Sequence, residues 1–239
     1  MIDELWLVAG QVAIIAVLGA AGALLFRRSF RLSWFLGALA LYVLYDGLLT
    51  RGFHLIPNLP ASADWNWLGK ALSLSGMLAI AALPAFGYAR SGLTLRQKPG
   101  WPVALGVLAA LSALFFYLAI SGADGKPDSA ETIAFQWTMP GLDEEVFYRG
   151  VLLLAMNEAF RAKVPILGAG IGFGGLLTSV LFGLAHALDY DAKGYSFDAM
   201  TFALTGGPSL ILLWLRERTG SVLLPIIGHN IANGASTLF

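Results

Sequence analysis

Apolar stretches of about twenty residues recur along the whole chain, and they restrict its fold more than any other feature. A helix needs about 20 apolar residues to cross a hydrocarbon core of roughly 30 Å. Of the 239 residues, 57% are hydrophobic and 13% charged, against about 25% charged in ordinary globular domains. The pattern predicts an all-α polytopic membrane protein, with about eight transmembrane helices in one bundle that forms a single membrane domain, residues 1–239. The expected spans are approximately 5–26, 32–50, 68–89, 101–121, 133–156, 166–187, 199–215 and 221–238.

Charge and cysteine content exclude several function classes. The 15 basic and 15 acidic residues cancel, and no basic run is long enough to form a tail, so we expect no binding of nucleic acid. The chain contains no cysteine, which excludes disulfides, thiolate metal sites and a cysteine nucleophile. The N-terminus is acidic, and the apolar stretch after it has no small-residue cleavage pattern, so we expect a retained first span.

Basic and acidic residues gather in alternate connections between the expected spans. Connections rich in Lys and Arg face the cytoplasm under the positive-inside rule, so both termini are expected on the outer side. The acidic connections carry Asp64, Asp124, Asp128, Glu131, Asp189, Asp191 and Asp198. The basic connections hold ten of the 15 basic residues: Arg27, Arg28, Arg31, Arg90, Arg96, Lys98, Arg161, Lys163, Arg216 and Arg218.

Three carboxylates and an arginine interrupt one apolar stretch, at Asp143, Glu144, Glu145 and Arg149. A charge in hydrocarbon costs about 3 kcal/mol on insertion scales, so the cluster indicates a functional site. On a helix, Glu145 and Arg149 are i and i+4 neighbours and suit an ion pair. Glu144 is rotated about 100° away and is expected to stay unpaired, which favours it as a base. Asp143 follows Pro140 and is expected to be a helix-start charge; taken alone, the whole trio also fits a charge cap at the outer surface.

Two of the three histidines lie in apolar spans. His229 and Asn233 are one turn apart on a common helix face, and His186 lies near the outer end of its own span. A lone histidine in an apolar helix is usually a packed residue, but the expected directions of the spans bring His186, His229 and Glu144 to the same depth. A convergent polar site is therefore expected. His54 falls in an outer interfacial loop and is expected to have no chemical task.

A glycine-rich run, Gly168 to Gly175, superficially resembles a phosphate-binding loop. It follows no expected strand and lies in an apolar span, so a dinucleotide site is not indicated. Small residues at i and i+4 predict close helix packing instead.

Three polar motifs follow one another across about 90 residues of the C-terminal half. They read Glu144-Glu145-x-x-x-Arg149, Phe182-x-x-x-His186 and His229-x-x-x-Asn233. In this order they are similar to the motifs of the CAAX prenyl protease and bacteriocin-processing (CPBP) family of membrane glutamic endopeptidases. The resemblance covers approximately residues 133–239, while the earlier residues match only as generic spans. Tyr148 stands where the family more often has phenylalanine, which puts no catalytic residue in doubt.

The resemblance implies a membrane-embedded protease that hydrolyses a peptide bond in a membrane-associated protein or peptide. Glu144 would activate the attacking water with help from His186, and His229 with Asn233 would hold the oxyanion. Glu145 and Arg149 would support this set. No cofactor and no metal is implied, and the lipid bilayer is the other expected partner. The expected location is a bacterial inner (cell) membrane, with the site toward the outer half, which suits exported substrates better than prenylated cytoplasmic ones.

Three alternatives use the same residues. Glu144, His186 and His229 have the ligand types of a zinc protease, although the His-Glu-x-x-His signature is missing. A non-catalytic membrane scaffold or immunity protein would use the polar residues to hold helices together. A transporter with Glu144 as a proton relay is the third alternative, although no internal repeat relates the two halves of the chain.

Overall fold

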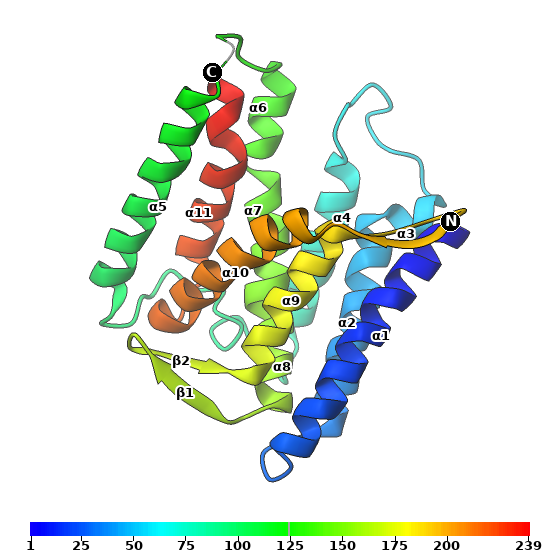
Figure 1. Ribbon diagram of the computed structural model, residues 1–239, viewed down its shortest axis with the longest axis vertical. Helices are drawn as coiled ribbons and strands as arrows, with labels where there is room; N and C mark the ends of the chain where they lie inside the picture. The colour runs from blue at the N-terminus through cyan, green and yellow to red at the C-terminus, as the bar shows by residue number, and fades with distance from the viewer. Residues whose placement is uncertain (124) are drawn as a thin grey trace.

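The computed structural model describes residues 1–123 and 125–239 and is mostly helical (Figure 1). Asp124, one of the acidic residues expected on the outer side, lies outside the described residues. Within the described part of the chain, four helices are long and apolar enough to cross a membrane, and α4 (Trp67–Ala82) and α9 (Phe173–Ala187) are shorter apolar helices. The helical prediction is confirmed in this coarser form, whereas eight complete spans stay a prediction. The four long helices are α1 (Ile2–Leu25), α2 (Leu32–Leu49), α5 (Trp101–Ser121) and α10 (Ala199–Thr219).

A column of successive helical segments replaces the single helix expected around the acidic stretch (Figure 1). Ser129 begins it as an N-cap that accepts a hydrogen bond from the Thr132 N–H. Pro140 lies in the first turn of the next segment, where its missing N–H costs nothing. A π-helix follows directly after the acidic residues. Such segments are rare in proteins, and those that occur are often found at functional sites. The column consists of α6 (Ala130–Gln136), α7 (Met139–Glu145), the π-helix η1 (Val146–Leu152) and α8 (Leu153–Ala159).

The glycine-rich run does not form the predicted helix packing over its whole length. Its first part forms the turn and the second strand of a β-hairpin made of β1 (Lys163–Ile166) and β2 (Ala169–Gly172), with Gly168 at φ +79° in the turn. Glycine reaches this left-handed conformation without strain. Close helix packing occurs only beyond the hairpin, at Gly174 of α9, where an added Cβ would lie 2.3 Å from the Met156 carbonyl oxygen of α8.

A second hairpin joins α9 to α10 and reaches back to the start of α1. It consists of β3 (Leu188–Asp191) and β4 (Gly194–Phe197). The Tyr195 hydroxyl donates to the Trp6 carbonyl oxygen. Asp198 then caps α10, accepting hydrogen bonds from the Thr201 hydroxyl and two backbone N–H groups. The bond from the Thr201 hydroxyl has the largest effect, and together these bonds hold the pKa of Asp198 below its usual value.

The main core lies where α2 packs against the column, and it contains aromatic and polar contacts. The rings of Tyr45 and Phe147 stack with centroids 3.9 Å apart and planes 5° from parallel. The Tyr42 hydroxyl donates to the side-chain carbonyl of Gln11 in α1, and the Gln11 amide donates to the Leu184 carbonyl of α9 at 3.4 Å. These buried bonds fix α1, α2 and α9 around the acidic stretch.

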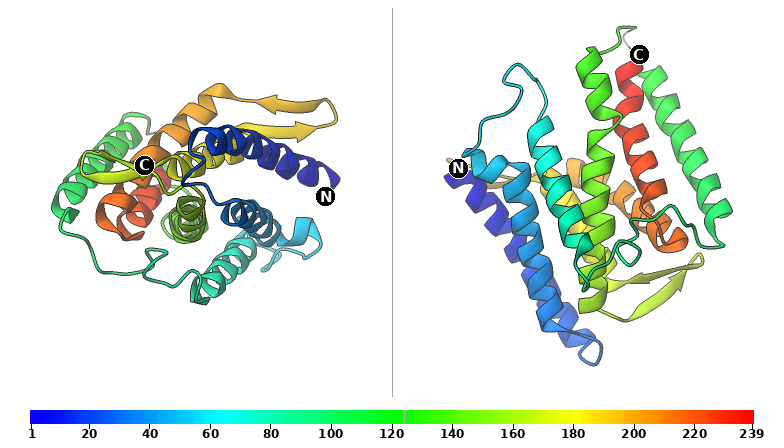
Figure 2. Two further views of the ribbon diagram at one scale, coloured as in Figure 1. Left: turned by 90° about the horizontal axis from the view of Figure 1, so that it is seen from below. Right: turned by 180° about the vertical axis from the view of Figure 1, so that it is seen from behind.

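The last helix, α11 (Leu223–Gly234), is followed by a short 3₁₀ turn, η2 (Ala235–Leu238). It lies beside α5 and α7, and with α9 it runs in the direction opposite to the column (Figures 1 and 2). The directions expected for the segments that carry Glu144, His186 and His229 are therefore those of the fold.

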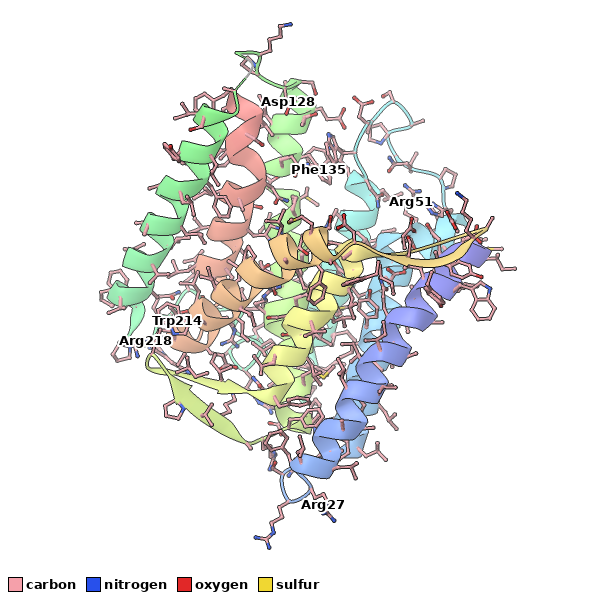
Figure 3. The ribbon with its side chains drawn as sticks, viewed as in Figure 1. Arg27, Arg51, Asp128, Phe135, Trp214 and Arg218 are labelled. Atoms are coloured by element: carbon pink, nitrogen blue, oxygen red, sulfur yellow. The ribbon has the colours of Figure 1, made fainter. Side chains whose placement is uncertain are left out.

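The connections predicted to be basic lie toward one end of the molecule. Arg27 and Arg218 lie at this end and Asp128 at the opposite one (Figure 3). The Arg31 N–H donates to the Ala159 carbonyl at 2.9 Å, which ties the first connection to the end of the column. One end is thus basic, while the side of the membrane that it faces stays a prediction.

A left-handed turn, α3 (Arg51–His54), lies near the acidic end, and all four of its residues have positive φ. Such a turn costs about 1–2 kcal/mol per non-glycine residue, so other contacts must hold it. His54 Nε2 lies 2.9 Å from Glu4 Oε1 of α1, and Arg51 donates to Asn66 at 3.1 Å. His54 therefore has an acidic partner that is 50 residues away in the chain, and it serves as a structural tie.

Candidate active site

Glu145 lies at the end of α7 with its predicted partner, Arg149, and with a histidine that was not predicted. Arg149 Nε lies 3.3 Å from Glu145 Oε2, and both side chains are fully buried. The structure thus contains the ion pair that the i, i+4 spacing predicts. The other oxygen, Oε1, lies 2.8 Å from His229 Nδ1. Glu145 therefore joins the column to α11 and orients the His229 imidazole.

Glu144 is paired, and the prediction that it lacks a cation is wrong. Lys70 of α4 places its Nζ 2.6 Å from Glu144 Oε1. The second oxygen, Oε2, has no hydrogen-bond partner among the described residues and lies 3.9 Å from His229 Nε2. The two oxygens of Glu144 thus have different neighbours, because one is bound to Lys70 and the other faces the His229 imidazole.

Asp143 is not the helix-start charge that its place after Pro140 predicted, because it lies beyond the first turn of α7. Its side chain is fully buried at the contact of α7 with α2 and α4. It accepts hydrogen bonds from Ser73 Oγ at 2.6 Å and Tyr45 Oη at 2.8 Å, and Lys70 Nζ lies 3.2 Å away. A buried carboxylate requires such partners, because an unpaired one is strongly destabilising.

Lys70 is the main residue that sequence reasoning missed at this site. Its side chain is only 10% exposed and contacts both Asp143 and Glu144. The sequence interpretation gave Lys70 no part in the site. A lone lysine among apolar residues of a span was the available signal, because an intramembrane charge normally has a partner.

The two histidines and Asn233 line one cavity of about 300 Å³. His186 Nδ1 lies 2.9 Å from the carbonyl oxygen of Phe182 one turn earlier. With that nitrogen protonated, Nε2 is the free nitrogen of His186. The structure brings the two histidines to one cavity, as the directions of their spans predicted, and Asn233 lies with them. Glu144 is not among the described residues that line the cavity. It lies 3.9 Å from His229, which does line it.

Apolar side chains form most of the remaining cavity wall. α5 contributes Leu111 and Phe115, and α10 contributes Leu204 and Leu212. Ser209 of α10 supplies a polar group that the sequence interpretation did not include. An apolar cavity with a few convergent polar groups is the usual form of a ligand site.

Arg149 connects the column to the cavity wall. Its Nη2 donates to Ser209 Oγ at 2.6 Å, and its guanidinium carbon lies 4.7 Å from the centre of the Phe182 ring. The charge is therefore balanced by Glu145 and held by contacts from α9 and α10. Arg149 fixes three elements relative to one another.

Asn230 has a role different from its neighbour His229. Its Oδ1 accepts a hydrogen bond of 2.7 Å from the Gly141 N–H, one of the free donors in the first turn of α7. An added Cβ at Gly141 would lie 2.5 Å from that oxygen, so only glycine allows this close approach of α7 and α11. Asn230 thereby sets the position of the acidic stretch.

The alternative of a zinc site depends on the free donors of Glu144, His186 and His229. Lys70 places an ammonium group on one oxygen of Glu144, where a metal cation would otherwise supply the positive charge. Among the described residues, no group of three or more His, Cys, Asp or Glu side chains is arranged to hold a metal ion. The donor set therefore fits an ion-pair network better than a metal cage.

A comparison with protein families matches residues 126–235 to the model described as Type II CAAX prenyl endopeptidase Rce1-like. Residues 126–235 form a domain of this family. The family resemblance stated from the three motifs is confirmed, and the apolar helices agree with an integral membrane protein. No curated protein and no solved structure matches the chain.

The Rce1-like domain contains every site residue predicted from the sequence, from Glu144 to Asn233. Lys70, Ser73 and Tyr45 lie outside it, in helices that pack on the domain. The side chains that donate hydrogen bonds to Asp143 and Glu144 therefore come from the part of the chain beyond the family match.

Proposed function

We propose that the chain is an intramembrane glutamic-type endopeptidase that hydrolyses a peptide bond in a membrane-associated protein or peptide. The observation that carries this proposal is the buried set of Glu144, Glu145 and His229 beside a cavity that His186 and Asn233 also line. Membership of the Rce1-like family supports a protease. The catalytic type rests on the carboxylate and imidazoles, because no other nucleophile or metal cage is needed.

Glu144 is proposed as the general base, assisted by His186. Peptide hydrolysis requires a base that takes a proton from the attacking water. Oε2 of Glu144 is the oxygen suited to this task, since Oε1 is bound to Lys70. A water placed between Oε2 and the free Nε2 of His186 would contact two proton acceptors. Substrate binding would have to bring the Glu144 carboxylate into the cavity.

His229 and Asn233 are proposed to stabilise the oxyanion of the tetrahedral intermediate. Fixed donors aimed at a developing negative charge are worth about 10²–10³ in rate for one donor. Nδ1 of His229 lies 2.8 Å from Glu145 Oε1, which fixes the orientation of the ring. Nε2 is then the nitrogen that remains to contact the oxyanion, and it lies 3.9 Å from Glu144 Oε2.

The substrate class follows from the cavity and from the predicted orientation. The apolar walls formed by α5 and α10 suit an apolar side chain of a membrane-bound segment. If the basic end faces the cytoplasm, the site lies toward the outer half of the membrane. Exported substrates such as leader peptides or C-terminal sorting tails then fit better than prenylated C-termini made in the cytoplasm.

The proposal is tested with Glu144→Gln, which removes the base and keeps the shape of the side chain. Membranes with wild-type protein and with Glu144→Gln are compared by mass spectrometry for cleaved peptides. Glu131→Gln is the matched control, because Glu131 lies at the start of α6 and bonds to Trp67 outside the cluster. We expect cleavage products from wild type and from Glu131→Gln, and none from Glu144→Gln.

Full activity of Glu144→Gln would end the glutamic mechanism. Loss of wild-type activity with a chelator and its recovery with zinc would support the zinc protease instead. A wild-type protein without any cleavage product, folded and in the membrane, would favour the scaffold alternative.

A further inference from the structure

A second cavity, of about 290 Å³, lies at the basic end of the molecule, away from the histidines. Four cationic side chains and two carboxylates contribute to its wall, which leaves two positive charges in excess. These residues come from the connection before α5, from α8, from β1 and from α10. They are Arg90, Lys98, Lys163, Arg216, Glu158 and Glu217.

Both carboxylates of this cavity are already bound by other groups. Glu158 accepts from Arg161 at 2.6 Å and from Arg90 at 3.0 Å. Glu217 accepts from Lys163 at 2.9 Å and from the Asn157 amide at 2.7 Å. Each carboxylate is therefore engaged by another cation, and neither forms an ion pair with Arg216 or Lys98.

Arg216 is the unusual member, because its side chain is buried and the adjacent Glu217 attracts it without forming a direct ion pair. The residue is 8% exposed. Nε donates to the Arg149 carbonyl at 3.0 Å and Nη2 to the Arg90 carbonyl at 3.3 Å. Among the described residues, no carboxylate lies within ion-pair distance of the guanidinium, and Nη1 has no hydrogen-bond partner. Buried charges are normally paired, since an uncompensated one is costly.

Lys98 adds a second cation without a partner. It is exposed, and its ammonium makes no hydrogen bond or ion pair with any described residue. Its backbone N–H donates to the Thr219 carbonyl at 2.7 Å, which fixes it against the end of α10. Arg216 and Lys98 thus present a guanidinium and an ammonium to one polar cavity.

We propose that this cavity binds a phosphate group, with Arg216 and Lys98 as its charged ligands. Guanidinium and ammonium groups form strong, charge-assisted hydrogen bonds to phosphate oxygens. A phosphate diester carries one negative charge, which neutralises half of the excess of two positive charges. Basic pockets between helices on the cytoplasmic side are suited to anionic lipid headgroups, and the basic end is the predicted cytoplasmic end. The source is either such a headgroup or free phosphate.

The site also touches the column that carries the acidic stretch. The carbonyl bonded to Arg216 Nε belongs to Arg149, within the π-helix. A phosphate that orders Arg216 therefore stabilises the fold at that point. The inference stands without the proposed protease activity, because it rests on binding alone.

The test measures the thermal unfolding of the purified full chain in a neutral detergent by tryptophan fluorescence. Short-chain phosphatidylglycerol, short-chain phosphatidylcholine and inorganic phosphate are titrated separately. A ligand that binds only the folded state raises the midpoint in proportion to the logarithm of its concentration. The variants are Lys98→Gln and the matched control Arg96→Gln, an exposed cation of the same connection that does not line the cavity.

We expect phosphatidylglycerol to raise the midpoint of wild type and Arg96→Gln equally. Lys98→Gln should require at least about tenfold more lipid for the same shift, because one charge-assisted bond is lost. If inorganic phosphate raised the midpoint as much as phosphatidylglycerol does, free phosphate would be identified as the ligand. If only phosphatidylglycerol raised the midpoint, the lipid headgroup would be identified. No shift with either anion, or an equal loss of response in Lys98→Gln and Arg96→Gln, would overturn the proposal. Arg216→Lys keeps the charge but loses the forked donors of the guanidinium, so it should need more lipid for the same shift. A response of Arg216→Lys equal to that of wild type would show that the guanidinium is not a ligand.

Discussion

The ammonium group of Lys70 lies 2.6 Å from Oε1 of Glu144, so an ion pair joins α4 to the end of α7. The same ammonium lies 3.2 Å from Asp143 Oδ2. One cation therefore serves two adjacent carboxylates that the apolar surroundings would otherwise leave unpaired. This arrangement determines which oxygen of Glu144 is free to contact a water molecule.

Replacing Lys70 by methionine should lower both stability and activity. Removing one partner of a buried ion pair costs about 3–5 kcal/mol, because the carboxylates stay in place without their cation. Thermal unfolding in detergent would measure the loss. The matched control is Lys193→Met, an exposed lysine in the turn of the second hairpin.

A double variant tests the cause of that loss. Asp143→Asn in the Lys70→Met protein removes one of the two unpaired charges, so part of the lost stability should return. Additive effects of the two substitutions would show that they are not coupled. An unfolding midpoint of Lys70→Met equal to that of Lys193→Met would contradict the ion pair itself.

The two asparagines of α11 should respond differently to substitution. Asn230→Ala removes the bond to the Gly141 N–H, so stability should fall by about 1 kcal/mol, as at a lost helix cap. Asn233→Ala should leave the unfolding midpoint near that of wild type and lower kcat by about 100-fold, as expected for an oxyanion donor. Unfolding and steady-state hydrolysis measured on the same preparations separate the two roles. A stability loss confined to Asn233→Ala would reverse the assignment.

The sequence predicted those parts of the site that depend on spacing within one segment or on the direction of spans. The pairing of Glu145 with Arg149 needs only the i, i+4 relation, and it is present. The approach of His186 and His229 needs only that their segments run opposite to the column. These relations are local or topological, so the linear pattern contains them.

The missing parts depend on which helices pack together. A helical wheel places Glu144 and Glu145 on different faces, but it does not show that α4 covers one of those faces with Lys70. Asp143 was expected to be a helix-start charge for the same reason, although α2 and α4 bury it. Hydropathy also merged the β1–β2 hairpin with α9, because an apolar glycine-rich run scores like a span. Pairing between distant segments decides all three cases.

The orientation in the membrane can be tested directly, because the chain contains no cysteine. A single cysteine at Lys126, in the loop before α6, should react with a membrane-impermeant thiol reagent added to intact cells. A single cysteine at Gln97, in the basic connection before α5, should react only after the membrane is opened. Both positions lie in connections between helices. The reverse labelling pattern would place the site in the inner half and favour cytoplasmic, prenylated substrates.

The contact between α8 and α9 can be tested at Gly174, where an added Cβ would lie 2.3 Å from the Met156 carbonyl oxygen. Backbone cannot move aside as a flexible side chain does, so Gly174→Ala should destabilise the fold by about 1–3 kcal/mol. Gly106→Ala in α5 is the matched control, since an added Cβ there meets nothing within 4 Å. That control should be neutral or more stable by up to about 1 kcal/mol, because alanine favours a helix over glycine. Thermal unfolding of both variants decides the matter, and equal midpoints would mean that α8 and α9 are not in the close contact that positions His186.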